Sequence, residues 1–292
     1  MDSIKGLNKN FYEWIELIKL EHTVFALPFA LSGFILATNG LPQIDKLLWT
    51  IVAFTGARAA AMSLNRVIDA EIDARNPRTK ERSIPKGTIK KRDALLLAIC
   101  SFIIMVFAAS KLTPLCVILS PIAIIWLSLY SYSKRFSFLC HFALGIALGG
   151  AALGGWIAAG GNPLAPDAYL LALAVTFWVT GFDIIYGCQD YEFDKRENIY
   201  SLPSKIGIAG ALIVSRILHI LTLVMLILLG CTSHLGIVYW LGLSIVAILL
   251  LYEHSMVRVQ DLSRVNAAFF TINGLISIST FVFILFDHLS RL

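Results

Sequence analysis

Long apolar stretches separated by short polar segments run along almost the whole chain. A helix that spans a bilayer needs about 20 predominantly apolar residues, and nine stretches approach or reach that length. They do not alternate between apolar and polar positions, which argues against spanning β-strands. The pattern predicts an all-α polytopic membrane protein with nine transmembrane helices. The predicted helices cover 17–38, 47–68, 93–110, 114–133, 139–159, 168–188, 208–231, 235–252 and 266–286.

The composition supports a membrane protein and excludes several soluble classes. Hydrophobic residues make up 58% of the 292 residues and charged residues 15%, and the mean hydropathy is +0.77. A soluble domain averages roughly 45–50% apolar and about 25% charged residues, so this chain has too few polar side chains to cover a soluble surface. A disordered chain and a soluble nucleic-acid-binding domain are excluded on the same ground, and no nucleic-acid partner is expected.

Basic residues lie almost entirely on one side of the predicted bundle. With nine helices, the N-terminal segment and the loops after the second, fourth, sixth and eighth helices share one face. That face carries 20 of the 24 Lys and Arg residues, whereas the opposite face carries Lys46, Lys111 and Arg291. Cytoplasmic loops of membrane proteins are enriched in these residues, so the N-terminus is predicted to be cytoplasmic. The first apolar stretch lacks a signal-peptide cleavage pattern and is expected to be retained as a helix.

The second predicted helix ends in a polar stripe. Asn65, Asp69 and Asp73 are spaced four residues apart, so they share one narrow face of an α-helix. Arg58 lies seven residues before Asn65, two turns back on nearly the same face. Pro77 is expected to end the helix just before it, because the residue that precedes a proline disfavours helical geometry.

The sixth predicted helix ends in a second acidic stripe. Asp183 and Asp190 are seven residues apart, and Asp190 and Asp194 are four apart, so a continuous helix would again place them on one face. Acidic residues at the carboxyl end of a helix oppose its dipole, and like charges four residues apart repel each other. A divalent cation would relieve the repulsion in both stripes, which favours a metal site over solvated helix ends.

The ligand types in the two stripes favour Mg²⁺, Mn²⁺ or Ca²⁺ over Zn²⁺, because they are carboxylate and amide oxygens. Mg²⁺ usually takes one or two carboxylates and shares its other positions with water and substrate phosphate. Loops rich in Lys and Arg adjoin both stripes, so the sequence predicts that Mg²⁺ and a diphosphate bind together. The predicted metal ligands are Asn65, Asp69, Asp73, Asp190 and Asp194.

Cationic and aromatic side chains near the stripes are candidates for substrate binding. Arg58 lies inside a membrane helix, where an ionisable residue is usually functional. The segment 130–135 at the end of the fourth helix has two open interpretations: tyrosine faces and bases that bind a carbocation and an anion, or an aromatic belt with snorkelling bases. Six histidines lack a close metal-binding spacing and are expected at packing or interface positions, with His22 as the exception. The candidate substrate-binding residues are Arg58, Asn65, Arg78, Lys80, Tyr130, Lys134, Arg135, Tyr186, Lys195 and Lys205.

At these residues the chain resembles the UbiA superfamily of intramembrane prenyltransferases. The stretch NRVIDAEIDARNPRTKERSIPKG is similar to the first motif of the family, NxxxDxxxD, with its basic loop, and DIIYGCQDYEFDKRENIYSLPSKIG is similar to the second motif, DxxxD. The stretches LEHTVFALPFALSG and YSYSKR also fit. Arg66 is a departure, since many members have Asp at this position.

The resemblance implies a fold and a set of roles. Nine helices would form a ring around a central cavity in one UbiA-like domain over 1–292, with both motifs under a cytoplasmic cap and a side opening to lipid for the prenyl tail. Asp183 would match a recurrent upstream acid. The expected partners are a polyprenyl diphosphate, an aromatic carboxylic acid acceptor and the lipid bilayer of a bacterial cytoplasmic (inner) membrane. The catalytic candidates are Asp69, Asp73, Asp190, Asp194 and Asp183.

The reaction that the resemblance implies is the Mg²⁺-dependent transfer of a polyprenyl group to a ring carbon of a 4-hydroxybenzoate-type acid in quinone biosynthesis. Asp183 or Asp190 would take the ring proton, and Arg135 or Arg58 would pair with the acceptor carboxylate. A naphthoate-type acceptor for menaquinone is an alternative, as are haem, chlorophyllide, homogentisate and a glycerol lipid. A cation-coupled transporter is an alternative of another class, but the acids lie at helix ends on one face, which favours the enzyme.

Overall fold

The computed structural model describes residues 12–292, apart from the side chains of 20–22, 24 and 25. The residues 1–11, which contribute to the predicted charge asymmetry, and the side chain of His22 lie outside this description. The described chain is helical, with one isolated bridge between Arg258 and Asp261. The helices are α2 (Leu20–Ala37), α3 (Ile44–Arg75), α4 (Lys91–Ala109), α5 (Pro114–Leu129), η1 (Tyr130–Arg135), α6 (Cys140–Ala158), α7 (Pro166–Gly187), η2 (Cys188–Asp190), α8 (Tyr191–Arg196), α9 (Leu202–Thr232), α10 (Ile237–Met256), α11 (Val265–Ala267), η3 (Ala268–Ile272) and α12 (Asn273–Ser290).

Eight helices in the described part of the chain are long and apolar enough to cross a membrane. They correspond to the second to ninth predicted stretches. The first predicted stretch corresponds to α2. Its apolar part, Ala26–Ala37, is shorter than the eight membrane-spanning helices. The all-α membrane fold is therefore confirmed, whereas the total of nine spans and the cytoplasmic N-terminus stay predictions.

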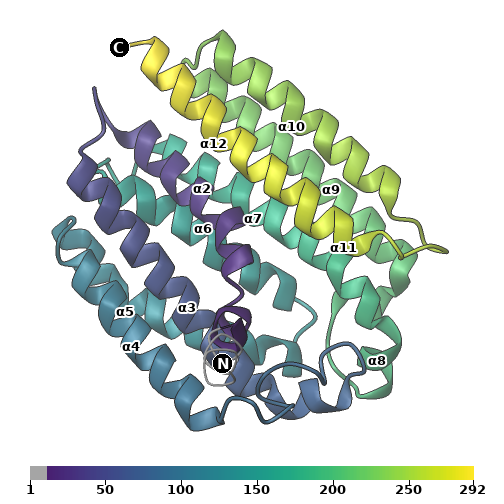
Figure 1. The fold of residues 1–292 in the computed structure, drawn as a ribbon. Coiled ribbons are helices and arrows are strands. Elements are labelled where there is room, and N and C mark those ends of the chain that lie inside the picture. The colour runs from purple at the N-terminus through teal and green to yellow at the C-terminus, as the bar shows by residue number, and fades with distance from the viewer. Residues whose placement is uncertain (1–11) are drawn as a thin grey trace, which may run out of the picture.

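The long helices lie roughly parallel or antiparallel to one another (Figure 1). Helix α3 packs along α4, and α6 packs against both α2 and α7. Helix α9 packs along α7, and α12 packs against α2 and α10. The span that contains α5 is the least enclosed, with 11% of its apolar window buried, so one long side of α5 is left for lipid.

Glycines allow α2 and α6 to approach each other closely. A Cβ atom added at Gly155 would lie 1.8 Å from the carbonyl oxygen of Ala30, and one at Gly33 would lie 2.1 Å from that of Ala152. Small residues at such contacts are typical of membrane helices, because close backbone approach replaces the missing hydrophobic drive between them.

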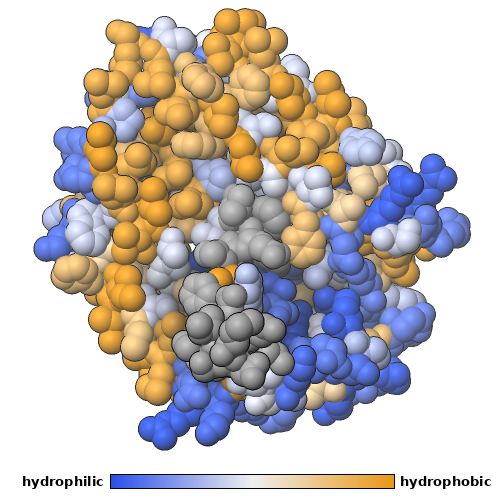
Figure 2. Space-filling view, viewed as in Figure 1, coloured by the Kyte–Doolittle hydropathy of each residue, from blue (hydrophilic) through white to orange (hydrophobic). Residues whose placement is uncertain are grey.

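Polar residues gather at the lower right border of the molecule (Figure 2), where the loop 76–90 and α8 lie in Figure 1. A carboxylate oxygen of Glu13 accepts hydrogen bonds from Ser83 and Thr88, both at 2.9 Å. Leu17 is 2% exposed and belongs to the apolar cluster beneath the loop. These contacts tie the loop to the segment that precedes α2.

Candidate active site

The polar stripe of α3 lies on an unbroken helix that faces the interior. As predicted, the helix ends before Pro77, and Asn76 leaves helical geometry with φ −86° and ψ 120°. Asp69 is 1% exposed and Asp73 is 4% exposed. Carboxylates that are this deeply buried need compensating partners, and each of them has one.

Each of the two α3 aspartates is paired with a cation from another part of the chain. Lys134 Nζ lies 2.6 Å from Asp69 Oδ2, and the side-chain amide of Asn65 donates to the same oxygen at 2.9 Å. Arg82 Nη1 donates to both carboxylate oxygens of Asp73 at 2.8 Å. Like-charge repulsion within the stripe is thus offset by bases in this structure.

The second acidic stripe is not carried by one continuous α-helix, in contrast to the prediction. Helix α7 ends at Gly187, a 3₁₀ turn covers η2, and α8 begins at Tyr191. A 3₁₀ turn has 3.0 residues per turn in place of 3.6, so the three aspartates lie on three successive helical segments and not on one uniform α-helix. Asp183 lies on α7 and Asp190 ends the 3₁₀ turn, while Asp194 lies on α8 and is 8% exposed.

One basic segment joins the two motifs. Asn76 Nδ2 and Arg78 Nε each donate to Asp190 Oδ1 at 2.9 Å, and a second guanidinium nitrogen of Arg78 contacts Asp190 Oδ2. Four residues later, Arg82 holds Asp73. The ends of α3 and α7 therefore converge on the segment 76–82.

Arg78 also contacts Tyr186. Its Nη1 donates to the tyrosine hydroxyl at 3.0 Å, and the guanidinium carbon lies 5.0 Å from the ring centroid. Burial by itself would lower the pKa of Arg78, but the hydrogen bonds and the charge of Asp190 outweigh burial and raise that pKa above its ordinary value. The guanidinium thus stays charged at any pH at which the protein works.

A histidine from α6 holds Asp183. His141 Nδ1 lies 2.7 Å from Asp183 Oδ2, and the backbone N–H of Leu202 donates to His141 Nε2 at 3.4 Å. An acceptor role for Nε2 places the ring proton on Nδ1, from which it is donated to the carboxylate. His141 is 5% exposed.

The donor set of the two motifs fits a hard divalent cation. All the ligands would be carboxylate or amide oxygens, and Asp69 Oδ1 is buried without a hydrogen-bond partner among the described residues. Within 12–292 no three or more His, Cys, Asp or Glu side chains are grouped so that they could hold a metal ion. Bases occupy the other oxygens of Asp69, Asp73 and Asp190, so a cation fits best when an anion binds with it and draws those bases away.

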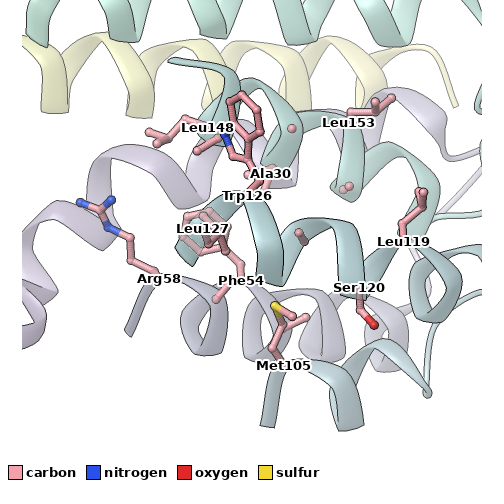
Figure 3. A pocket seen from close by; sticks show the side chains of 18 of the residues that line it. Ala30, Phe54, Arg58, Met105, Leu119, Ser120, Trp126, Leu127, Leu148 and Leu153 are labelled. Atoms are coloured by element: carbon pink, nitrogen blue, oxygen red, sulfur yellow. The ribbon is translucent and has the colours of Figure 1, made fainter. Parts of the chain in front are cut away.

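Two further predicted residues lie deeper, at an apolar cavity of about 430 Å³. Arg58 and Tyr130 are among its lining residues, and Figure 3 shows Arg58 at one end, with Leu119 and Leu153 toward the other. The guanidinium Nε of Arg58 is buried and has no hydrogen-bond partner among the described residues.

Of the remaining predicted binding residues, Arg135 lies at the first motif, whereas Lys80, Lys195 and Lys205 are exposed. Arg135 donates to the backbone carbonyl of Ile68 and lies over the ring of Tyr132. Lys195 and Lys205 lie over aromatic rings, those of Tyr191 and Phe138.

Two contacts of the site were missed by reasoning from the sequence. Asn76 was regarded only as the end of a helix, although its position beside the first motif could have identified it. His141 is expected from the sequence at a packing or interface position, and nothing in the local sequence indicates its partner, which lies 42 residues away on another helix.

An all-helical membrane fold with two aspartate motifs joined by a basic segment is the arrangement expected of an intramembrane prenyltransferase. The model of the UbiA prenyltransferase family matches residues 26–275 of this chain. The chain belongs to this family and is a prenyltransferase. This membership decides between the two classes weighed from the sequence in favour of the enzyme.

Relatives of known name cover most of the chain. The 4-hydroxybenzoate octaprenyltransferase of Xanthomonas campestris is 32% identical over 252 residues, which cover 85% of this chain and 81% of the relative. The enzyme of the same name from Vibrio cholerae is 30% identical over 235 residues, which cover 79% of this chain and 81% of the relative.

Solved structures share the fold. The apo structure of a UbiA homologue from Aeropyrum pernix K1 matches with a TM-score of 0.83 and 30% sequence identity. The match covers 91% of this chain and 98% of the homologue. A UbiA homologue from Archaeoglobus fulgidus bound to DMAPP and Mg²⁺ is 20% identical and has a TM-score of 0.73, with 96% of this chain and all of that chain covered. The second likeness concerns the fold alone.

Proposed function

We propose that this prenyltransferase moves a polyprenyl group from a polyprenyl diphosphate to a ring carbon of a 4-hydroxybenzoate-type acid, with Mg²⁺, at the cytoplasmic side of a bacterial inner membrane. The names of the relatives from Xanthomonas campestris and Vibrio cholerae support this acceptor. The observation that carries the proposal is the joining of the two motifs by one basic segment, in which Arg82 holds Asp73 while Arg78 holds Asp190.

Donor binding would exchange the partners of these bases. Guanidinium groups bind phosphate oxygens in the same forked geometry with which they bind carboxylates. Arg78, Arg82 and Lys134 can therefore leave Asp190, Asp73 and Asp69 for the diphosphate and release the carboxylates for the metal. Bound Mg²⁺ would neutralise negative charge that develops on the leaving diphosphate, and Asp69 Oδ1, which has no partner in the described structure, is the first oxygen ready to hold it.

The transfer breaks one C–O bond and one ring C–H bond and forms one C–C bond. The diphosphate leaves with the electron pair of the C–O bond, and the ring carbon ortho to the phenol hydroxyl supplies the electrons of the new bond. The ring proton passes to Asp183, whose side chain is 24% exposed while its Oδ2 is held by His141. A carboxylate that is fixed on one oxygen and open on the other is suited to this role.

Arg58 is the better supported partner for the acceptor carboxylate. Arg135 already donates to the carbonyl of Ile68, whereas the buried Nε of Arg58 has no partner among the described residues. A buried guanidinium N–H that lacks an acceptor gains from an anionic ligand. Tyr130, at the same cavity, offers an aromatic face to an allylic cation.

The test uses the full chain in lipid nanodiscs with Mg²⁺ and octaprenyl diphosphate. Acceptors are 4-hydroxybenzoate, its methyl ester and a dihydroxynaphthoate, and mass spectrometry identifies products while released diphosphate is measured. We expect prenylated 4-hydroxybenzoate and a much lower rate with the ester, because the ester cannot pair with Arg58. A product from the naphthoate alone would replace the acceptor by the menaquinone-type alternative, and no diphosphate release with any acceptor would refute the proposal.

A further inference from the structure

The apolar cavity at Arg58 extends far along the membrane helices. On α6 its lining residues run from Leu144 to Ala158, a rise of about 21 Å at 1.5 Å per residue. Its volume of about 430 Å³ lies within the range of roughly 300–1,000 Å³ found for pockets that bind small ligands. Helices α3, α5 and α6 supply most of the wall, and α2, α4, Leu112 and Tyr130 of η1 supply the rest.

The polar end of the cavity points to the aspartate motifs. Tyr130, which lines it, lies one turn before Lys134, and Lys134 is paired with Asp69. Arg58 lies seven residues before Asn65 on α3, or about 10 Å along the helix. A molecule whose anionic head is held at Lys134 can thus place an apolar tail in the cavity.

The cavity opens to lipid between α5 and α6. Ile122 on α5 and Ile146 on α6 line the cavity, yet they are 63% and 47% exposed. Gly150 also lines it and is exposed. Trp126 closes the gap nearer the motifs, since its indole N–H donates to the carbonyl of Ala143 on α6 at 3.1 Å. A tail longer than the cavity can therefore continue into the bilayer beyond Gly150.

Two glycines of α6 have no role in helix contact. A Cβ atom at Gly150 or Gly154 would meet no atom within 4 Å, and both residues line the cavity. Their neighbours on the same helix differ: a Cβ at Gly149 would lie 2.1 Å from Thr176 Oγ1, and one at Gly155 would lie 1.8 Å from Ala30 O. Close helix packing therefore explains Gly149 and Gly155 and leaves Gly150 and Gly154 unexplained.

We propose that Gly150 and Gly154 determine the donor length that the enzyme accepts, by keeping the wall of the tail cavity open toward the bilayer. Larger side chains at these positions would fill the passage, and the enzyme would then accept short prenyl diphosphates and discriminate against long ones. The inference rests on the proposed function, because it takes the occupant of the cavity to be the isoprenoid tail of the donor.

The experiment compares Gly150→Leu, Gly154→Leu and wild type, each as the full chain in nanodiscs with Mg²⁺ and 4-hydroxybenzoate. Donors are geranyl diphosphate and octaprenyl diphosphate, and kcat/KM is measured for each. Ala209→Leu is the matched control, because Ala209 is exposed on α9 and does not line the cavity. We expect the ratio of kcat/KM for the short donor to that for the long donor to rise about tenfold or more in both glycine variants, and to stay at the wild-type value in the control.

An unchanged ratio in both glycine variants would overturn the inference, even if the wild type is an active prenyltransferase. Failure of the wild type to transfer either donor would instead refute the proposed function. Because leucine could disturb folding, thermal unfolding of each variant is measured, and the smaller Gly150→Val and Gly154→Val changes are assayed in parallel. If the leucine variants do not fold, a wild-type donor ratio in valine variants that fold as wild type does would overturn the inference.

Discussion

His141 Nδ1 lies 2.7 Å from Asp183 Oδ2, and the two side chains belong to different membrane helices, α6 and α7. The backbone N–H of Leu202 at the start of α9 donates to the other ring nitrogen. The imidazole is therefore fixed between three helices, and it presents its N–H to the carboxylate. This arrangement fixes the rotamer of the group to which we assign the ring proton.

If Asp183 is the general base and His141 positions it, loss of the imidazole should slow removal of the ring proton and leave the affinity for the prenyl diphosphate unchanged. We expect Asp183→Asn to lower kcat by roughly 10² or more, and His141→Ala to lower kcat less, with the KM for the prenyl diphosphate unchanged. An acceptor deuterated at the ortho ring positions distinguishes slower proton removal from a general structural effect of the substitution. The isotope effect on kcat should grow in His141→Ala, because proton removal becomes slower than C–C bond formation.

His141→Gln is the control for that prediction, since its side-chain amide retains an N–H donor for Asp183. Recovery of part of the lost rate is expected in this variant. Equal isotope effects in wild type and His141→Ala, with an unchanged KM for the prenyl diphosphate, would contradict the assignment of Asp183 as the base.

Removal of a motif carboxylate should abolish turnover without loss of the fold. Asp69→Ala and Asp190→Ala each remove an oxygen ligand from the site at which Mg²⁺ and diphosphate are proposed to bind. Both proteins are expected to insert into the membrane, because their apolar helices are unchanged. Diphosphate release measures activity, and membrane fractionation measures insertion. Activity near the wild-type value in either variant would show that the carboxylate it lacks is not a required ligand of the metal.

The ion pair between Arg82 and Asp73 predicts that Mg²⁺ and diphosphate bind cooperatively. Mg²⁺ alone has to compete with a guanidinium that donates to both oxygens of Asp73. We expect Arg82→Gln to bind Mg²⁺ alone about tenfold more tightly, a coupling of about 1.4 kcal/mol, and to bind the prenyl diphosphate more weakly. Isothermal titration with Mg²⁺ alone measures the first effect, and titration with the prenyl diphosphate measures the second.

Lys80→Gln is a suitable control for this titration, because Lys80 is a basic residue of the same loop that is exposed to solvent. Its Mg²⁺ affinity should equal that of the wild type. Tighter Mg²⁺ binding in Lys80→Gln to the same extent as in Arg82→Gln would show a general effect of net charge and not competition at Asp73.

Two adjacent glycines of α6 should respond in opposite ways to a single added methyl group. A Cβ atom at Gly155 would lie 1.8 Å from Ala30 O, whereas one at Gly154 meets nothing within 4 Å. Gly155→Ala is expected to cost about 1–3 kcal/mol of stability or more through overpacking, and Gly154→Ala is expected to be neutral or slightly stabilising. Thermal unfolding in detergent measures the difference, and similar midpoints for the two variants would contradict the contact between α2 and α6.

A buried carboxyl of α10 offers a stability prediction away from the motifs. Glu253 is fully buried; its Oε1 accepts from Asn273 Nδ2 at 2.9 Å, while Oε2 lacks a hydrogen-bond partner among the described residues and lies 3.7 Å from His219 Nδ1. Glu253→Gln removes the ionisable group at constant shape, so the unfolding midpoint should stay equal or rise. Glu253→Ala should lower it, because Asn273 loses its acceptor and a cavity forms.

Much of the fold could be predicted because it depends on local pattern. Spans of about 20 apolar residues define membrane helices with little reference to their neighbours, and the spans from α3 to α12 match the predicted stretches. Pro77 ends α3 where its ring and missing N–H require. The spacing of Asn65, Asp69 and Asp73 places them on one face of any helix. The sequence by itself thus determined the class of fold, the first motif and the end of its helix.

Tertiary structure decided which groups meet. The cation beside Asp69 comes from residue 134, the histidine beside Asp183 comes from residue 141, and the loop that carries Arg78 reaches Asp190 across 112 positions of sequence. A 3₁₀ turn separates α7 from α8 within the second motif, and side chains of five helices, α2 to α6, come together to line the cavity. Helix spacing along a chain does not encode such contacts, because they depend on how each helix is rotated and how closely it approaches its neighbours.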